Sequence, residues 1–528
     1  ARTEENLQDD QAMTNMDIQM LPDVDVVELD NGFRALLVER ASLPVVASVL
    51  WYQVGSRDEH TGETGVSHFL EHMMFKGTDV FGKGEIDLQT SKMGGSNNAF
   101  TDTDSTAYYF SMASDRWETV LEIEASRMRG CLLDPAEFES EKKVVLEELA
   151  MGEDEPWRPL YQTCEALMFQ THSYHHPVIG YKEELERLGP DGMRAYYQRN
   201  YGPNRACLTV VGAIDKKRTR ARIQELFGDI PRADDRKVPI REPEQLGERR
   251  ATLRTPHSVT RMCMGFPTCR MGERDDYALD LIAHDLGNSK NSRLYKRLVV
   301  KDQTVTDVSV LNEVRQDPGG FFVLCELHPG ADHRKVEKAI HEEIEALTRE
   351  GVAERDLKRI RIQIRSSFLF QDETALDMAM KLARFEAGTE KGYATLADVL
   401  PTYDSMQRRE LRDIAAKYLQ PDRATVVWGV PAAAAEPSRK AKKATKRKTK
   451  KVAVKAKSVK AAPAKKKAAK KKAAKKKAAK KNAAKKAAPK KKAAKKSVPK
   501  KSVAKQATRK PAAKKRAGKK SNPGRKKS

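Results

Sequence analysis

The last part of the chain limits what the rest can fold into. Residues 437–528 hold 43 lysines and arginines and no aspartate or glutamate, in runs such as "KKAAKKKAAKKKAAKK". Such a segment cannot bury enough apolar surface to form a core, and charge repulsion and prolines keep it extended. We therefore predict a disordered Lys/Ala/Pro-rich basic tail over residues 433–528, and a fold made by the residues before it.

The first 436 residues carry the opposite charge. They hold 74 acidic and 56 basic side chains, a net charge of −18, although the whole chain has a net charge of +25. An acidic body and a basic tail need separate explanations. The tail, residues 437–528, predicts salt-dependent binding of polyanions such as nucleic acid, and without aromatic residues the binding is expected to be non-specific. Acidic surfaces, the body included, are the rival partners.

The body repeats one pattern of strands and helices. The first half has strand-like runs at Val24–Arg40, Val45–Glu59, Thr101–Ala113 and Tyr201–Ile214, and the second half has them at Ser258–Thr268, Gly319–Pro329 and Arg423–Pro431. Amphipathic helical patterns lie between these runs. The repetition predicts an α+β fold in α/β layers, with two structurally homologous halves, each a mostly antiparallel sheet packed with helices.

Composition changes indicate the domain boundaries. Residues 1–20 are polar and predict a flexible N-terminus, and a segment rich in proline and charge predicts a linker over residues 233–248. We therefore place the first half at residues 21–232 and the second half at residues 249–432.

The stretch "SHFLEHMMF" (Ser67–Phe75) places costly polar groups within an apolar helical run. His68 and His72 lie four residues apart, so they share one face of a helix, with Glu71 beside them. Two imidazoles with a carboxylate ligand and an open position form a catalytic zinc site, in which a nearby glutamate takes the proton of the metal-activated water. The motif therefore predicts His68 and His72 as zinc ligands and Glu71 as general base. A histidine pair that faces the core is the alternative that the motif alone leaves open.

A third ligand has to come from elsewhere in the chain. The helix predicted over Pro135–Met151 contains five glutamates, and most of them fit a solvated charged face. Glu141 and Glu148 lie seven residues apart and therefore share a face beside the buried stripe. We choose Glu148 as the ligand and Glu141 as a second catalytic-site residue behind it, which accepts a hydrogen bond from a histidine N–H or a bound water.

These residues carry a family resemblance. The H-x-x-E-H order is the signature of the inverzincins, and the chain resembles the pitrilysin-type (M16) zinc peptidases, most closely the mitochondrial processing peptidase-like subfamily (M16B). In that family the glutamate ligand follows the second histidine by 76 positions, which is the position of Glu148, and another glutamate precedes it by seven, as Glu141 does. "GGSNNAFTDTDSTAYYF" (Gly94–Phe110) and "HHPVIGYKEEL" (His175–Leu185) match further family segments, and the resemblance spans about residues 20–430.

The resemblance implies an enzyme that binds one Zn²⁺ per chain and cleaves unfolded peptides. It places Asn98 and Ala99 on an edge strand beside the metal, where an extended peptide adds to the sheet by main-chain hydrogen bonds. Phe100 would help to shape the pocket after the scissile bond. A simple Gly/Asn turn before a strand is the alternative for this segment.

The second half departs from the family pattern. "DLIAH" (Asp280–His284) has an aspartate in place of the first ligand and an alanine in place of the base, so we expect no second zinc site. The family's arginine and tyrosine that steady the peptide carbonyl and the oxyanion fall on Val299 and Thr306, and Arg297 is out of register by two residues.

This loss leads to a hypothesis about partners. A paralogous M16 subunit would supply the missing arginine and tyrosine, which makes this chain the zinc-bearing subunit of a heterodimer. A homodimer with modest activity, a catalytically weak scaffold of the same fold, and a nucleic-acid-associated protein acting through the tail are the alternatives.

Cysteine usage and hydropathy bear on the compartment. The six cysteines form no C-x-x-C pair, which favours reduced thiols and the cytoplasm. No apolar run reaches the roughly 18 residues of a membrane span. The chain starts at Ala1, as it would after removal of an initiator methionine or of a longer leader, so export, to the periplasm for example, stays open.

Overall fold

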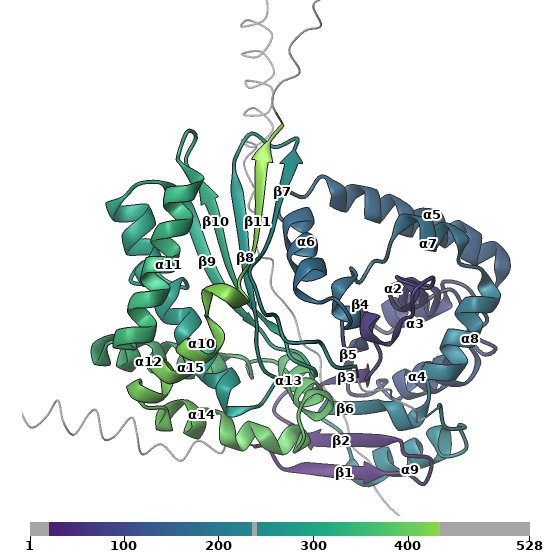
Figure 1. The fold of residues 1–528 in the computed structure, drawn as a ribbon. Coiled ribbons are helices and arrows are strands. Elements are labelled where there is room, and N and C mark those ends of the chain that lie inside the picture. The colour runs from purple at the N-terminus through teal and green to yellow at the C-terminus, as the bar shows by residue number, and fades with distance from the viewer. Residues whose placement is uncertain (1–20, 235–239, 433–528) are drawn as a thin grey trace, which may run out of the picture. The chain divides into compact units, whose positions relative to one another are not determined.

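The computed structural model describes residues 21–234 and 240–432, which form two sheets with their helices (Figure 1). The predictions for residues 1–20 and for the basic tail at 433–528 lie outside the described residues, as does part of the predicted linker. The described helices include none that is both long enough and apolar enough to cross a membrane.

The first half contains a six-stranded sheet in the order β1-β2-β6-β3-β5-β4. Its strands are β1 (Val24–Glu28), β2 (Arg34–Glu39), β3 (Val45–Tyr52), β4 (Ser96–Thr101), β5 (Thr106–Ala113) and β6 (Ala206–Gly212). β2 and β6 are parallel and all other neighbours are antiparallel. The predicted hairpin forms between β1 and β2, with Gly32 at a φ of +85°, a backbone conformation that glycine adopts without strain.

Helices cover both faces of this sheet. Those of the first half are α2 (Val66–Met73), α3 (Glu85–Lys92), α4 (Thr119–Gly130), α5 (Pro135–Glu153), α6 (Arg158–Met168), α7 (Lys182–Arg187), α8 (Pro190–Asn200) and α9 (Lys216–Phe227). Alternation along the strands separates two apolar layers. Leu37, Leu50 and Tyr108 face the core under α2 and α4, whereas Leu36 and Val49 point to the opposite face.

The second half has a five-stranded sheet in the order β7-β11-β8-β10-β9. Its strands are β7 (Arg249–Thr255), β8 (Arg261–Pro267), β9 (Val305–Glu313), β10 (Gly320–Leu327) and β11 (Thr425–Pro431). Its helices are α10 (Arg274–Leu286), α11 (His333–Glu350), α12 (Glu354–Phe370), α13 (Ala375–Gly388), α14 (Leu396–Ser405) and α15 (Arg408–Tyr418), and a π-helical turn covers Tyr295–Lys301. Counted from β2 and from β7, both sheets have the same order, first-fifth-second-fourth-third. The prediction of two homologous sheet-and-helix halves is confirmed.

Each half lends one helix to the sheet of the other. Leu160 and Cys164 of α6 pack with Cys263 and Val427 of the second sheet. In the same way, Leu382 of α13 packs on the outer face of the first sheet, and Figure 1 shows α13 beside β3 and β6. The two sheets are therefore joined by shared apolar cores.

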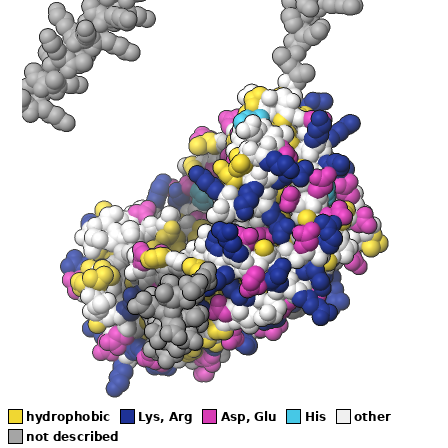
Figure 2. Space-filling view, turned by 90° about the vertical axis from the view of Figure 1, so that its left-hand side faces the viewer, with side chains coloured by type: hydrophobic (Ala, Val, Ile, Leu, Met, Phe, Trp, Pro, Cys, Tyr) yellow, Lys and Arg dark blue, Asp and Glu magenta, His cyan; other side chains and the backbone are white. Residues whose placement is uncertain are grey.

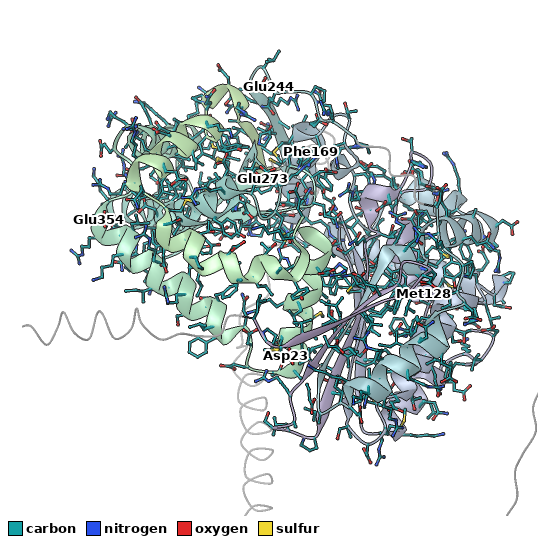
Figure 3. The ribbon with its side chains drawn as sticks, turned by 90° about the horizontal axis from the view of Figure 1, so that it is seen from below. Asp23, Met128, Phe169, Glu244, Glu273 and Glu354 are labelled. Carbon is teal, nitrogen blue, oxygen red and sulfur yellow. The ribbon has the colours of Figure 1, made fainter. Side chains whose placement is uncertain are left out.

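The surface and the cysteines agree with a packed protein of mixed charge. Basic and acidic side chains are interspersed on the face shown in Figure 2. Figure 3 shows the side chains from below, with Met128 of α4 in the first half and Glu354, where α12 begins, in the second. All six cysteines are buried free thiols.

Candidate metal centre

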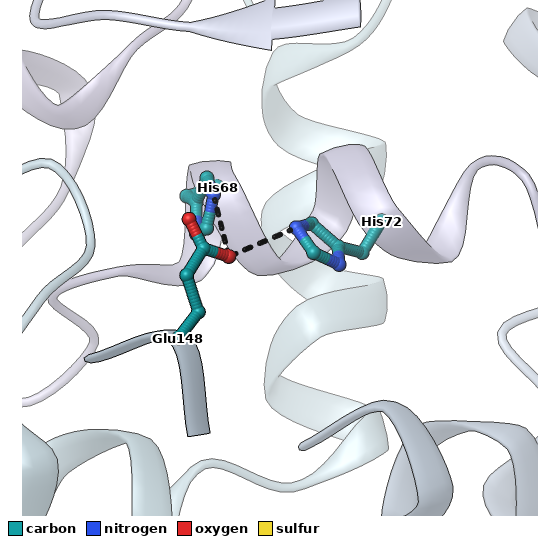
Figure 4. Close-up of side chains that lie close together, drawn as sticks. All are labelled: His68, His72 and Glu148. Atoms are coloured by element: carbon teal, nitrogen blue, oxygen red, sulfur yellow. Dashed lines mark ion pairs between the residues drawn. The ribbon is translucent and has the colours of Figure 1, made fainter. Parts of the chain in front are cut away.

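Helices α2 and α5 bring the three predicted ligands together. His68 Nε2 and His72 Nε2 lie 3.7 Å and 3.6 Å from Glu148 Oε2 (Figure 4), and the ligand atoms of all three residues lie within 4.8 Å of one another. The apolar side of α2 fixes this arrangement, because Phe69 is buried and packs against Phe138 of α5 with ring centroids 4.7 Å apart. The polar side of α2 then faces the adjoining turn of α5.

The donor set fits a zinc ion. Tetrahedral zinc with nitrogen and oxygen ligands holds those atoms roughly 3.4 Å apart, close to the two distances measured to Glu148. His68 Nδ1 is buried and has no hydrogen-bond partner among the described residues. Burial, His72 and Arg158 lower the pKa of His68 to about 4, so at neutral pH the imidazole has the uncharged form that binds metals.

Glu141, predicted as an acceptor for a histidine N–H or a bound water, lies behind His72. His72 Nδ1 and Glu141 Oε1 are 3.0 Å apart, and Lys76 Nζ lies 2.5 Å from Glu141 Oε2. Burial acts to raise the pKa of Glu141, but hydrogen bonds from Lys76 and His72 outweigh it and hold the pKa below its ordinary value. An ionised Glu141 accepts a hydrogen bond from His72 Nδ1–H, which leaves the Nε2 lone pair free for a metal ion between His72 and Glu148. Lys76 was not predicted, although its position four residues after His72 is a signal for it.

Glu71 is held by the end of the edge strand. Thr101 Oγ1 donates a hydrogen bond of 2.6 Å to Glu71 Oε2. Burial raises the pKa of Glu71 above its ordinary value, although the bond from Thr101 acts in the opposite direction. The role of Thr101 was also missed, because it depends on how closely β4 approaches α2.

The three predicted substrate-binding residues lie on β4, at an edge of the first sheet. Asn98, Ala99 and Phe100 pair with β5 on one side, and no described strand pairs with the other. Asn98 Oδ1 accepts the backbone N–H of Ala99 at 2.9 Å. Ala99 packs toward the core under α2, whereas Phe100 packs against Trp51 on the opposite face, with ring centroids 5.3 Å apart.

The corresponding helix of the second half, α10, offers no such donor set. Asp280 is enclosed, and its carboxylate accepts hydrogen bonds from Asn312 Nδ2 at 2.9 Å and from the Tyr403 hydroxyl. His284 is partly buried, and burial lowers its pKa. Side chains of β9 and α14 thus satisfy the Asp280 carboxylate.

A second group with metal-ligand spacing lies near β7. Ligand atoms of Glu248, Glu337 and His341 fall within 4.8 Å of one another. Arg250, however, forms ion pairs with both glutamates, and Trp428 Nε1 donates to Glu337 at 2.9 Å. A cation in this position makes the group an ion-pair network.

The missing oxyanion residues are not replaced by their neighbours. Val299 packs against the core of the second half, and Thr306 Oγ1 donates to the Glu326 carbonyl at 3.1 Å. Arg297 pairs with Asp302 at 2.7 Å and with Glu342 at 3.1 Å. Arg297 is therefore engaged by acidic groups of its own half.

Two homologous sheet-and-helix halves, with a cluster of two histidines and a glutamate in the first, are the arrangement expected of a two-domain metallopeptidase fold. Residues 34–182 match the family model "Insulinase (Peptidase family M16)", and residues 187–364 match "Peptidase M16 inactive domain". The chain belongs to peptidase family M16.

Known relatives cover most of the body. The "Zinc protease PqqE" of Helicobacter pylori is 26% identical over 414 residues, 77% of this chain and 93% of that protein. The "Uncharacterized zinc protease YmxG" of Bacillus subtilis is also 26% identical, over 74% of this chain and 95% of its own length. A crystal structure of "a protease from Helicobacter pylori" matches with a TM-score of 0.74 and 26% identity, over 78% of this chain and 100% of the other. A "peptidase M16 inactive domain" from Pseudomonas fluorescens, 17% identical with a TM-score of 0.71, has the same fold.

Proposed function

We propose that this chain is a zinc-dependent metalloendopeptidase that cleaves unfolded peptides, with one Zn²⁺ held by His68, His72 and Glu148. The observation that carries the proposal is the convergence of these three ligand atoms, within 4.8 Å of one another, beside a glutamate on the same helix. The names of its relatives as zinc proteases support the same metal and the same class of reaction.

A zinc ion held by His68, His72 and Glu148 would supply Lewis-acid polarisation of a peptide carbonyl and of an attacking water. Glu71 would accept the proton of an attacking water and deliver it to the leaving amine. Thr101 holds the Glu71 carboxylate in one orientation. Glu141, paired with Lys76, keeps His72 in the tautomer that binds the metal.

The free edge of β4 is the proposed binding site for the peptide main chain. An extended peptide would add beside Asn98, Ala99 and Phe100 as a further strand. The Asn98 amide, which bonds the Ala99 N–H, would release that N–H to the peptide.

The oxyanion is the part of the mechanism for which this chain offers no donor at the family positions, Val299 and Thr306. We propose that a paralogous M16 subunit supplies an arginine and a tyrosine, with a homodimer of lower activity as the alternative. The ion pairs of Arg297 with Asp302 and Glu342 support this, because they leave Arg297 engaged within its own half.

The test is turnover of a quenched-fluorescence peptide library by the full chain with zinc, alone and with co-expressed M16 paralogues. We expect cleavage that rises about 100-fold or more with the right partner, the effect typical of an oxyanion donor. Glu71→Gln should lose turnover but keep zinc. If Glu71→Gln cleaves peptides at the rate of the unaltered chain, the proposed mechanism is wrong.

A catalytically weak scaffold of the same fold is the second candidate, and the hydrophobic and hydroxyl side chains at positions 299 and 306 favour it. It predicts a chain that binds zinc and peptides but shows no turnover with any paralogue.

A further inference from the structure

A cavity of about 550 Å³ lies between the two halves, next to the edge strand. Its walls come from Trp51 and Phe100 of the first sheet, the turn Asp102–Ser105, the β9–β10 turn at residues 313–316, and α13. Its volume is in the range of pockets that bind small ligands. None of the proposed zinc ligands lines it, and Phe100, which is expected to shape the pocket after the scissile bond, is part of its wall.

The cavity and the metal centre lie on opposite faces of the same strand. Thr101 bonds Glu71 on the face of β4 that meets α2, whereas Phe100 packs on Trp51 on the face that meets the cavity. Successive side chains of a peptide strand also point to opposite faces of a sheet. A peptide added to β4 would therefore direct every second side chain toward the cavity.

Most charged groups that line the cavity are bound to one another or to nearby residues. Asp104 accepts from Arg57 and from the Tyr174 hydroxyl. Buried Arg315 pairs with Glu165 and Glu313, Lys381 pairs with Asp372, and Asp377 accepts the Thr374 hydroxyl as a helix cap.

Arg384 of α13 differs from these groups. It is exposed, and among the described residues it forms neither a hydrogen bond nor an ion pair. The carboxylates that feel its charge are held by other donors. Asp102 accepts the N–H groups of Asp104 and Ser105, Asp276 accepts the Gly272 N–H, and Asp280 accepts Tyr403. The guanidinium is thus a cation with unused donors at the wall of the cavity.

We infer that this cavity is a specificity site for an acidic side chain of the substrate peptide, with the Arg384 guanidinium as its partner. Guanidinium and carboxylate match in geometry and can form two parallel hydrogen bonds. Trp51 and Phe100 would cover the aliphatic part of the bound side chain. The inference rests on the proposed peptidase function, since it names the substrate class of that site.

The test measures binding separately from cleavage. Fluorescein-labelled decapeptides of alanine, serine and valine, with a single Glu, Gln or Lys scanned along the sequence, are titrated against full-length Glu71→Gln protein by anisotropy. We expect a glutamate at alternate positions to tighten binding about tenfold over glutamine and lysine, the order of a charge-assisted hydrogen bond.

Variants of the cavity then assign the preference. Arg384→Ala should remove the advantage of glutamate, and Arg384→Glu should shift the preference to lysine, while Arg384→Lys keeps part of it. Arg409→Ala, which removes an arginine that is 85% exposed on α15 outside the cavity, is the matched control and should bind as the parent does. If Arg384→Glu fails to fold, Arg384→Gln still tests whether the advantage of glutamate is lost.

The outcomes separate this inference from the proposed function. Cleavage of peptides without a glutamate preference, or a preference that survives Arg384→Ala, overturns the specificity site and leaves the peptidase. Glutamate binding through Arg384, with no cleavage by the unaltered chain with zinc and paralogues, keeps the site and overturns the peptidase.

Discussion

Helices α2 and α10 occupy the same place in the two halves, since each follows the second strand of the shared strand order. On α2, His68 Nε2 and His72 Nε2 lie 3.7 Å and 3.6 Å from Glu148 Oε2, too far for a hydrogen bond but close enough to share a metal ion. On α10, Asp280 is enclosed by Asn312 and Tyr403. The same helix position in the shared fold therefore carries either metal-binding side chains, as on α2, or polar side chains that are hydrogen-bonded within the protein, as on α10. A few residues determine which of the two is present.

The difference between the two helices is tested by giving α2 a residue that α10 has. His68→Asp replaces the imidazole with a carboxylate too short to reach the position of Nε2, so we expect zinc to fall from about one per chain to almost none, and turnover to fall at least about 1,000-fold. Metal analysis and peptide cleavage check both. His284→Ala, at the corresponding helix, is the control and should change neither; loss of zinc from this variant would show that the second half takes part in metal binding.

The exchanged helices predict that the halves unfold together. Leu160 of α6 and Leu382 of α13 are each 1% exposed in a core shared with the other half. Replacing either with alanine should lower the free energy of unfolding by about 2–5 kcal/mol. Urea unfolding followed by circular dichroism should show a single transition that moves in both variants. Leu246→Ala, at an 87% exposed position, is the control, and two transitions of which only one moves would contradict the shared cores.

Lys76 pairs with Glu141, which in turn is hydrogen-bonded to the proposed ligand His72. Lys76→Met removes the cation that pairs with Glu141, and the affinity for zinc should weaken about 10- to 100-fold. Competition with a fluorescent zinc chelator measures it. Lys76→Arg should restore most of the affinity. Lys83→Met, which removes an exposed pair with Glu137, should have no effect; an equal loss in both lysine variants would point to general charge rather than to this contact.

The closed polar core of α10 predicts a pH dependence of stability. Burial, and then the neighbouring Asp280, raise the pKa of Asp276 to about 8. The folded state therefore binds a proton that the unfolded chain has lost, and its contribution to stability disappears as the pH rises from about 4 toward 8. In urea unfolding, the free energy of unfolding of Asp276→Asn should decrease less between pH 5 and pH 8 than that of the unaltered chain. If the free energy of unfolding of both proteins had the same dependence on pH, Asp276 would be ionised over the whole range from pH 5 to pH 8.

The smallest effect on peptide cleavage is expected from removal of the basic tail. Removal of residues 437–528 should leave peptide cleavage unchanged and abolish retardation of DNA in a gel at low salt. DNA binding that survives the truncation would place the polyanion site in the body.

The fold could be predicted where strands are buried on both faces. The apolar runs of β3, β6 and β11 stand out in the sequence, and the repeated pattern indicates the duplication. The edge strands β7 and β9, "RRATLRT" and "VTDVSVLNE", were not predicted because their exposed faces carry polar side chains. Nor does any local pattern reveal that α6 and α13 pack on the sheet of the other half.

Some residues of the candidate site could also be predicted from the sequence, and others could not. His68, Glu71 and His72 are readable because helical spacing alone places them together. The choice of Glu148 rests on the helix face that it shares with Glu141, and the family spacing of 76 positions after His72 agrees with that choice. Thr101 depends on a tertiary approach that no single-sequence pattern encodes, since it acts from a strand.

X-ray absorption at the zinc edge tests whether α2 and α5 hold a zinc ion through two histidines and a glutamate. Zinc held by the first half should show two imidazole ligands, a carboxylate and no sulfur, at about one ion per chain. The group at Glu248, Glu337 and His341 would show a single imidazole. A spectrum with one imidazole, with sulfur ligands, or with no bound zinc would contradict a metal centre built by α2 and α5.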